Sequence, residues 1–361
     1  MDRRRVIAAC LLALPALAAG QADGVRLYVE ACAACHGGDG RGRSPSQLGF
    51  ETPVPDFTDC DFANREPDAD WYAIVHQGGP VRGFDRMMPA FGRVLEAQEI
   101  EAVLRRVRSF CADPRWPRGE LNLPRALFTE KAYPEDEAVI TTTLITAGND
   151  SISHKFLWEQ RFGAVNQIEI SLPVTRADLG PPDGWQTAAG DLGIGIKHTL
   201  HHNHEKGSIL SIGGELLLPT GDDTRGFGKS SSVFEPYVAF GKILPNDSFF
   251  QVQALAELPS DSATEDEVAV RLAVGRTLTR GGSFGRAFTP ILEVLAAREL
   301  RGAANVNWDV VPQFQVTLNR RQHIMANLGL RVPVTERSTR DAQLVFYLLW
   351  DWFDGGVREG W

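Results

Sequence analysis

The C-terminal two thirds of the chain alternate between apolar and polar residues, the pattern of β-strands whose two faces meet different surroundings. The alternation is clearest at residues 167–172, 308–316 and 324–332. About twelve such segments follow one another from residue 138 onward, and no helix is expected among them. Their expected starts lie near residues 139, 153, 165, 189, 208, 231, 248, 267, 286, 305, 322 and 342.

The expected strands are about ten residues long, which suits a tilted membrane crossing better than an ordinary globular strand. The lengths of the connections alternate as well. The longer, polar connections are residues 175–186, 220–230, 260–266 and 335–342. The shorter ones are residues 163–164, 201–207, 245–247 and 319–322. Short turns on the periplasmic side and longer loops outside are typical of outer-membrane barrels, so we predict an antiparallel β-barrel of about twelve strands.

The polar side of the alternation carries many charged residues and amides. These residues are Glu215, Glu235, Glu257, Arg271, Glu293, Gln313, Gln315 and Arg331. An unpaired carboxylate in a dry core costs several kcal/mol, so the pattern predicts a water-filled, acidic lumen rather than a packed interior. The alternative is a soluble β-sandwich that turns its polar faces to solvent.

The N-terminal part shows helical rather than strand periodicity. Apolar residues recur at helical spacing over residues 25–32 and 100–107, and residues 71–76 read as a further helix that ends at Gly78. In the first helix, Val25, Tyr28, Val29 and Cys32 are expected to form the buried stripe. We therefore expect a small all-α domain ahead of the barrel.

Two further segments complete the organisation of the chain. Residues 1–22 have the layout of a secretory signal peptide: arginines, an apolar stretch, and a small-residue cleavage site at 16–18 or 20–22. Prolines at positions 114, 117, 124 and 134 mark a helix-poor linker. The predicted parts are a signal peptide (1–22), an α-helical domain (23–112), a linker (113–137) and a β-barrel (138–361).

The composition and motifs of the 361 residues exclude several functional classes. Lysines and arginines number 37 against 46 acidic residues, a net charge of −9, which excludes a basic nucleic-acid binder. With 43% hydrophobic residues the chain has enough apolar material to fold. No phosphate-binding loop, nucleophile with a partner base, or H-E-x-x-H motif is present, so a hydrolase has no support.

The segment from Cys32 to His36 reads C-x-x-C-H, the attachment signature of c-type haem. Two thiols on one helical turn can each add to a haem vinyl group, and His36 then reaches the iron as the proximal ligand. Zinc sites and redox dithiols also use C-x-x-C. A second C-x-x-C is absent and no βαβ pattern surrounds the motif, so covalent haem c is the expected cofactor.

The expected second axial ligand is Met88, which lies about fifty residues downstream and directly precedes Pro89. A proline there suits an extended loop that presents a thioether to iron, and Met/His ligation suits an electron carrier. Met87 is the alternative sulfur ligand. His76 is a rival ligand, although bis-His ligation leaves the Met88-Pro89 pair unexplained.

These motifs together resemble a class I monohaem cytochrome c over residues 23–112. The resemblance rests on Cys32-x-x-Cys35-His36, the glycine-rich residues 37–42, the helix of Trp71, Met88-Pro89 and the closing helix. It implies covalent haem on Cys32 and Cys35, axial ligation by His36 and Met88, and one-electron transfer. Many members lack the pair Cys60 and Cys111; in an oxidising compartment we expect this pair to form a disulfide.

The whole arrangement resembles the cytochrome-porin fusions of outer membranes, which include iron oxidisers. This resemblance implies an electron carrier rather than an enzyme, anchored in outer-membrane lipid with its cytochrome domain in the periplasm. It would relay single electrons between a periplasmic redox protein and the cell exterior, with extracellular metal oxidation or reduction as the enzymatic alternative. The cytochrome domain is expected at the mouth of the barrel, which would admit small solutes.

Three other readings remain at this point. The haem domain could gate or sense for a channel, or the chain could be a periplasmic carrier with a β-sandwich docking domain. Four histidines between positions 198 and 204 crowd what reads as a turn, and such clusters can bind metal.

Overall fold

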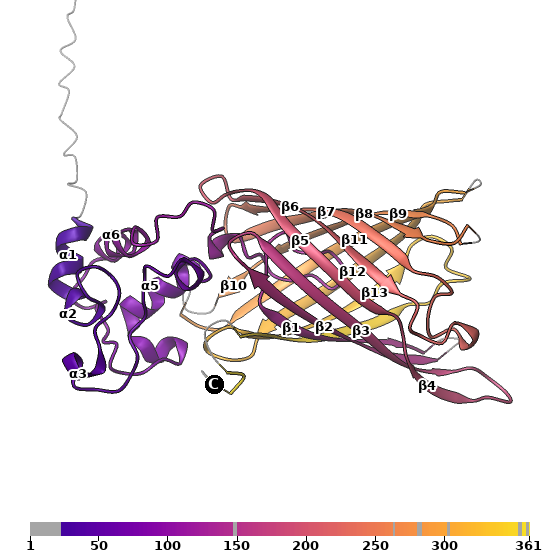
Figure 1. Cartoon of the computed structure of the whole chain (residues 1–361), viewed down its shortest axis with the longest axis horizontal. Coiled ribbons are helices and arrows are strands. Elements are labelled where there is room, and N and C mark those ends of the chain that lie inside the picture. The colour runs from indigo at the N-terminus through magenta and orange to yellow at the C-terminus, as the bar shows by residue number, and fades with distance from the viewer. Residues whose placement is uncertain are drawn as a thin grey trace, which may run out of the picture.

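The computed structural model describes residues 23–146, 150–262, 264–279, 284–301, 304–352, 356–358 and 361. The predicted signal peptide, residues 1–22, lies outside the described residues. Figure 1 shows a small helical domain followed by a β-barrel of tilted strands, with the helical domain outside one end of the barrel. The expected fold class, an all-α domain joined to an antiparallel barrel, is confirmed.

The helical domain contains the three helices that the sequence predicts and three shorter ones. Its α-helices are α1 (Gly24–Ala31), α2 (Ala33–His36), α3 (Pro45–Leu48), α4 (Cys60–Ala63), α5 (Asp68–Gln77) and α6 (Ala97–Arg108). Short 3₁₀ helices are η1 (Gly79–Arg82), η2 (Gly119–Leu121) and, in a barrel loop, η3 (Asp223–Arg225). Among the helices of the described residues, none is both long and apolar enough to cross a membrane.

The buried face of α1 differs from the predicted one. Val25 and Val29 are 55% and 59% exposed, whereas Leu27 and Tyr28 are buried. The helix packs on α6 through Gly24, where a side chain would lie 2.1 Å from the backbone oxygen of Ala102. This close approach of the two backbones turns the helix so that Leu27 and Tyr28, rather than the valines, face the core.

Twelve long strands form the wall of the barrel, and the expected starts lie within three residues of the observed ones. The strands are β1 (Glu137–Ile145), β2 (Ser151–Phe162), β3 (Asn166–Asp178), β5 (Leu192–Asn203), β6 (Ser208–Leu218), β7 (Val233–Leu244), β8 (Ser248–Pro259), β9 (Glu267–Arg276), β11 (Ala287–Glu299), β12 (Asn307–Thr317), β13 (Ile324–Pro333) and β14 (Gln343–Asp351). Two short strands, β4 (Trp185–Ala189) and β10 (Leu278–Thr279), extend hairpins beyond this wall. The predicted loop 175–186 is therefore partly a hairpin of β3 and β4.

Strand pairing closes the sheet on itself. Each long strand pairs antiparallel with its sequence neighbours, β14 pairs with β1, and β9 pairs with β11. A closed ring of strands has no free edges and encloses a lumen. The alternative of a soluble β-sandwich is therefore wrong for this chain.

The outer surface of the barrel is apolar. Large apolar side chains that are more than a third exposed occur on most of the strands; examples are Phe156, Ile170, Ile196, Val238, Val270, Phe314, Leu328 and Phe346. The residues predicted to be polar and inward do face the lumen, with Glu293, Gln313 and Gln315 buried there. An apolar belt outside and polar residues inside is the arrangement of a transmembrane barrel.

The lumen is not open along its whole length, which corrects the expectation of a water-filled bore. The predicted linker enters the barrel, and residues 119–136, here called the plug, lie within it (Figure 1). Leu121, Leu123, Ala132 and Tyr133 of the plug are buried against inward-facing side chains of the wall. A proline-rich sequence predicts a helix-poor connection but does not reveal that this connection is enclosed.

The backbone of the plug is held by side chains of the wall. Glu293 accepts hydrogen bonds from the backbone amides of Leu127, Phe128 and Thr129 at 2.7–3.2 Å, and from the Thr129 hydroxyl at 2.7 Å. The Gln251 amide and Tyr347 hydroxyl donate to backbone oxygens of the plug at 2.9 and 2.7 Å. Since a buried amide or carbonyl without a partner is costly, these contacts are what permits irregular chain inside the bore.

The charges of the plug are matched by charges of the wall. Arg125 pairs with the buried carboxylates of Glu137 and Glu159. In a second pair the wall carries the positive charge: the fully buried Lys197 of β5 donates to Glu130 of the plug at 2.7 Å. Removing one partner of such a pair leaves a buried charge unmatched, which costs about 3–5 kcal/mol.

The helical domain docks on the end of the barrel that carries the short turns. Arg82 is 3% exposed and donates to Asp70 at 2.5 Å and to the backbone oxygen of Phe284 at 3.0 Å. Glu66 pairs with His323 at 2.6 Å. The domain is therefore fixed at the mouth of the barrel, as expected, while the plug and not the domain fills the bore.

A plugged lumen makes a prediction for ion flow. In planar bilayers the unaltered protein should give no steady conductance, whereas Glu293→Ala, which removes the shared acceptor of three successive amides of the plug, should give frequent opening events. Glu257→Gln, a change near the other end of the lumen, is the matched control and should stay silent. A steady conductance of the unaltered protein would show that the plug does not seal the barrel.

Candidate haem site

The two cysteines of the C-x-x-C-H motif lie on one turn at the junction of α1 and α2. Cys32 caps both helices, and the backbone amides of Cys35 and His36 donate to its carbonyl at 3.1 and 2.9 Å. Both thiols are free and half-buried. Burial, with the neighbouring Cys35, raises the pKa of Cys32 to about 11, so this thiol is not an activated thiolate of a redox dithiol.

The imidazole of His36 is the most informative group of the motif. Its ring stacks on Phe57 with centroids 4.9 Å apart, and its buried Nδ1 has no hydrogen-bond partner among the described residues. Burial lowers the pKa of His36 to about 4, so the ring is neutral at neutral pH. A neutral imidazole whose Nδ1 is not engaged by another protein group can serve as an iron ligand, and these residues therefore fit a covalently bound haem.

The segment that contains Met88 is fixed against the end of α5. The backbone amide of Gly79 donates to the Met88 carbonyl at 3.0 Å, and those of Phe91 and Gly92 donate to α5 at 2.9 and 3.0 Å. The side chain of Met88 is half-buried, whereas that of Met87 is 47% exposed. Of the two sulfur atoms, the burial favours Met88 as the iron ligand.

His76 has other contacts, which weakens it as a rival ligand. Its ring stacks on Phe284 of the barrel at a centroid distance of 5.0 Å and on Tyr72 at 5.7 Å. Its Nδ1 lies 2.9 Å from the amide nitrogen of Gln77. The histidine therefore belongs to the interface between the domain and the barrel.

A single apolar core supports the motif. Trp71 packs with Phe57 and Phe62 in this core, under the guanidinium of Arg108. Tyr28 is fully buried and donates to the Gly37 carbonyl at 2.8 Å, and its burial raises its pKa to about 12. The hydroxyl therefore stays protonated and holds the glycine that follows His36.

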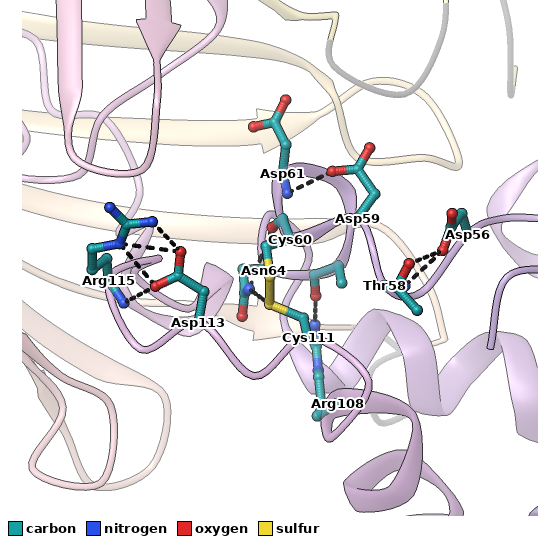
Figure 2. Close-up of a disulfide and its surroundings, with 11 residues drawn as sticks. Asp56, Thr58, Asp59, Cys60, Asp61, Asn64, Arg108, Cys111, Asp113 and Arg115 are labelled. Carbon is teal, nitrogen blue, oxygen red and sulfur yellow. Dashed lines mark hydrogen bonds and ion pairs between the residues drawn. A yellow bond between two sulfur atoms is a disulfide. The ribbon is translucent and has the colours of Figure 1, made fainter. Parts of the chain in front are cut away.

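Cys60 and Cys111 form the expected disulfide, shown in Figure 2. The bond joins the first turn of α4 to the residues after α6, 51 positions apart in the sequence. Asn64 donates to the Cys111 sulfur at 3.0 Å, and Asp59 caps α4 through the Asp61 amide at 3.0 Å (Figure 2). The disulfide ties the loop that carries Phe57, the ring beneath His36, to the end of the domain.

The histidines between positions 198 and 204 do not converge. Most of this segment is the end of β5 rather than a turn, with a bulge between Thr199 and His201. His198 bonds to Asn166 at 2.7 Å, and His202 to the Arg115 carbonyl at 3.1 Å. Among the described residues, the groups whose spacing could hold a metal ion consist of carboxylates and contain no histidine.

Comparisons with known proteins found similarities to separate parts of the chain. Residues 19–105 match the sequence model of the family described as cytochrome c oxidase, cbb3-type, subunit III. No curated protein matches the chain. A segment similar to this cytochrome c family is therefore joined to a closed barrel of twelve long strands.

Solved structures similar to the chain include outer-membrane barrels. An outer membrane channel from Pseudomonas putida F1 has 13% identity and a TM-score of 0.44, with 63% of this chain and 99% of that chain covered. NanC porin has 7% identity and a TM-score of 0.43, with 59% and 98% covered. LpxR from Salmonella typhimurium has 8% identity and a TM-score of 0.41, with 60% and 99% covered.

The disulfide makes a prediction for stability. Replacing Cys60 and Cys111 by serine should lower the free energy of unfolding of the helical domain by about 3–4 kcal/mol, because the closed loop no longer restricts the unfolded chain. Urea titration of the full chain in detergent, followed by helical circular dichroism at 222 nm, measures this. The unaltered protein under reducing conditions is the control and should behave like the variant; equal midpoints with and without the disulfide would contradict the prediction.

Proposed function

We propose that this chain is an electron-transfer protein of the outer membrane that carries one haem c. In this proposal Cys32 and Cys35 bind the haem covalently, and His36 and Met88 are the axial ligands of its iron. The observation that carries the proposal is the half-buried, neutral His36, whose Nδ1 has no partner among the described residues, next to two free thiols on one turn. The sequence has one C-x-x-C-H motif, which supports one haem per chain.

The residues of the domain hold and shield the haem in this proposal. The bound haem supplies reversible one-electron oxidation of its iron, and histidine with methionine ligation raises the reduction potential. Phe57 supports the ring of His36, and the Cys60–Cys111 disulfide limits the movement of the loop from which Phe57 projects. Little rearrangement of the chain is then needed when an electron arrives or leaves.

Three features of the barrel support a place in the outer membrane. The wall is closed, its outward face is apolar, and its three tightest turns, residues 163–165, 204–207 and 245–247, lie at one end. Short turns of outer-membrane barrels face the periplasm. The helical domain docks at this end, so we assign the haem to the periplasmic side.

The plug favours electron transfer over the alternative of a channel with a sensing domain. A hydrogen-bonded segment that occupies the bore narrows the path through it. The helical domain is held by buried contacts such as Arg82 and lies outside the bore. We therefore propose that the barrel anchors the haem domain, which exchanges electrons with a periplasmic redox protein.

The outer half of the lumen is the part of the barrel through which the proposed electron transfer could reach the cell exterior. Lys155 faces the lumen from β2, and its side chain is 47% exposed, so water reaches this level of the barrel. We propose that redox-active small solutes enter there and exchange electrons with the haem across the plug. Oxidation or reduction of extracellular metal ions is the activity that fits this route.

Cofactor and location can be tested together. Outer membranes of cells that express the protein should give a pyridine haemochrome spectrum of haem c, with one haem per chain after denaturation. The Cys32→Ala, Cys35→Ala double variant should insert equally well and carry no covalent haem. Haem-free unaltered protein, or haem protein recovered in the soluble fraction, would refute the proposal.

The two methionines allow the ligand assignment to be tested separately. Met88→Ala should abolish the methionine-to-iron absorption band at the red edge of the visible spectrum. It should also lower the reduction potential by on the order of 0.1 V, since axial ligands tune haem potentials over about 0.8 V. Met87→Ala is the matched control and should change neither quantity; the reverse result would assign Met87 as the ligand.

A further inference from the structure

Strand pairing places acidic residues opposite one another along a row that crosses much of the barrel wall. Glu159 lies opposite Glu169, and Glu215 lies opposite Glu235. Phe234 pairs with Leu258, which places Glu235 beside Glu257, and Glu257 pairs with Glu267. Because the strands of a barrel are tilted, such a row climbs along the wall from the inner end toward the outer mouth.

The glycines of β5 join the two parts of this row. Gly195 lies between Glu169 and Glu215 and is opposite both. A side chain at Gly195 would lie 2.2 Å from Glu169 Oε1, and one at Gly193 would lie 1.9 Å from Glu215 Oε1. Both carboxylates therefore turn over β5 toward each other, into space that only glycine leaves open.

The inner part of the row is neutralised by basic residues. Arg125 pairs with Glu159, and Lys197 lies 2.7 Å from Glu130 of the plug and 4.0 Å from Glu159. Glu130, Glu159 and Glu169 are close enough together to hold a metal ion. The ammonium group of Lys197 already supplies a positive charge to the first two of these carboxylates.

The outer part of the row has few close basic partners. Among the described residues, the basic side chain that pairs with Glu169, Glu215, Glu235, Glu257 or Glu267 is Lys155, at 4.0 Å from Glu215, which also accepts a hydrogen bond from Ser171. More distant attractions come from Lys197 on Glu169, from Arg271 on Glu235 and Glu267, and from Lys229 on Glu267, whereas Glu215 and Glu257 repel Glu235. Like charges directly opposite in a sheet repel each other, so the outer part of the row needs cations from solution.

A second and independent group points into the same space. Tyr237 on β7 is 8% exposed, and its hydroxyl has no hydrogen-bond partner among the described residues. The phenol fits over Gly213, where a side chain would lie 2.4 Å from the hydroxyl oxygen. Glu130, Glu169, Glu159 and Glu215 all act on it electrostatically, so this buried, unsatisfied oxygen lies within the acidic part of the lumen.

We propose that Glu169, Glu215 and Tyr237 form a binding site for a hard divalent cation, at the level where the plug borders the outer half of the lumen. The donors are all oxygen atoms, which suits calcium, magnesium or manganese rather than a soft metal. Glu235, Glu257 and Glu267 lead from the outer mouth to this site and concentrate cations along the wall. The site is independent of the haem, although it lies on the route that the proposed function assigns to solutes from the exterior.

Binding of Mn²⁺ to the full chain in detergent tests the site, since free and bound Mn²⁺ differ in their electron paramagnetic resonance spectra. The unaltered protein should bind one Mn²⁺ saturably, and excess Ca²⁺ should displace it. Glu169→Gln and Glu215→Gln should each weaken binding by about tenfold or more, and Tyr237→Phe should weaken it by several-fold. Glu205→Gln, in an exposed inner turn, is the matched control and should bind like the unaltered protein.

Folding of each variant is checked by the heat-dependent electrophoretic mobility of the closed barrel. Absence of saturable binding at millimolar Mn²⁺ and neutral pH would overturn the proposal, since the carboxylates would then be balanced by protons. Binding that survives all three lumen changes would overturn it as well. The haem spectrum is recorded in parallel, so that failure of this site and failure of the proposed electron-transfer function give different results.

Discussion

The carboxylate of Glu293 satisfies three successive backbone amides of the plug, and the closed state of the barrel depends on contacts of this type. The backbone of a segment inside a barrel cannot pair with the strands of the wall, because the backbone groups of those strands already hydrogen-bond to each other. The buried amides and carbonyls of the plug that are not paired within the segment itself therefore need side chains of the wall as partners. This requirement explains why the inward face carries glutamates, glutamines and a tyrosine at the level of the plug, rather than the small apolar residues of a packed core.

The same constraint links the two domains. The plug runs from the helical domain directly into β1, so its position inside the bore fixes the place at which the domain leaves the barrel. Arg82 and Phe284 then fix the orientation of the domain through contacts with α5, next to the segment that contains Met88. The candidate haem site is therefore part of one continuous framework with the barrel, and its surroundings depend on the barrel loop around Phe284.

The sequence predicts the wall of the barrel well, because a strand between lipid and a polar lumen must alternate with a period of two residues. The starts of β6, β8 and β9 agree with the structure to the residue. The plug could not be predicted, because prolines and glycines indicate an irregular connection wherever it lies. The ion pairs of buried lysines and arginines with carboxylates could not be predicted either, because they join segments that are far apart in the sequence.

At the candidate haem site, too, the sequence predicts some features and the fold is needed for others. Cys32, Cys35 and His36 are candidates from the sequence alone, because haem attachment requires them to be adjacent and their spacing can be read directly. For the second ligand, the fold adds evidence on Met88, Met87 and His76 that the sequence lacks, since burial and the contact of His76 with Phe284 are properties of the packed domain. The buried face of α1 was mispredicted for a similar reason: the contact of Gly24 with α6 outweighs the apolar character of Val25 and Val29.

The pairing of β14 with β1 has a consequence for biogenesis. The ring closes between the first and the last strand of the wall, and the plug lies immediately before the first. Both ends of the plug lie at the mouth where the helical domain docks, because Arg65 of the domain contacts Gly119 and pairs with Asp136 directly before β1. The plug can therefore enter the bore from that mouth, and neither the domain nor a strand has to pass through the closed ring.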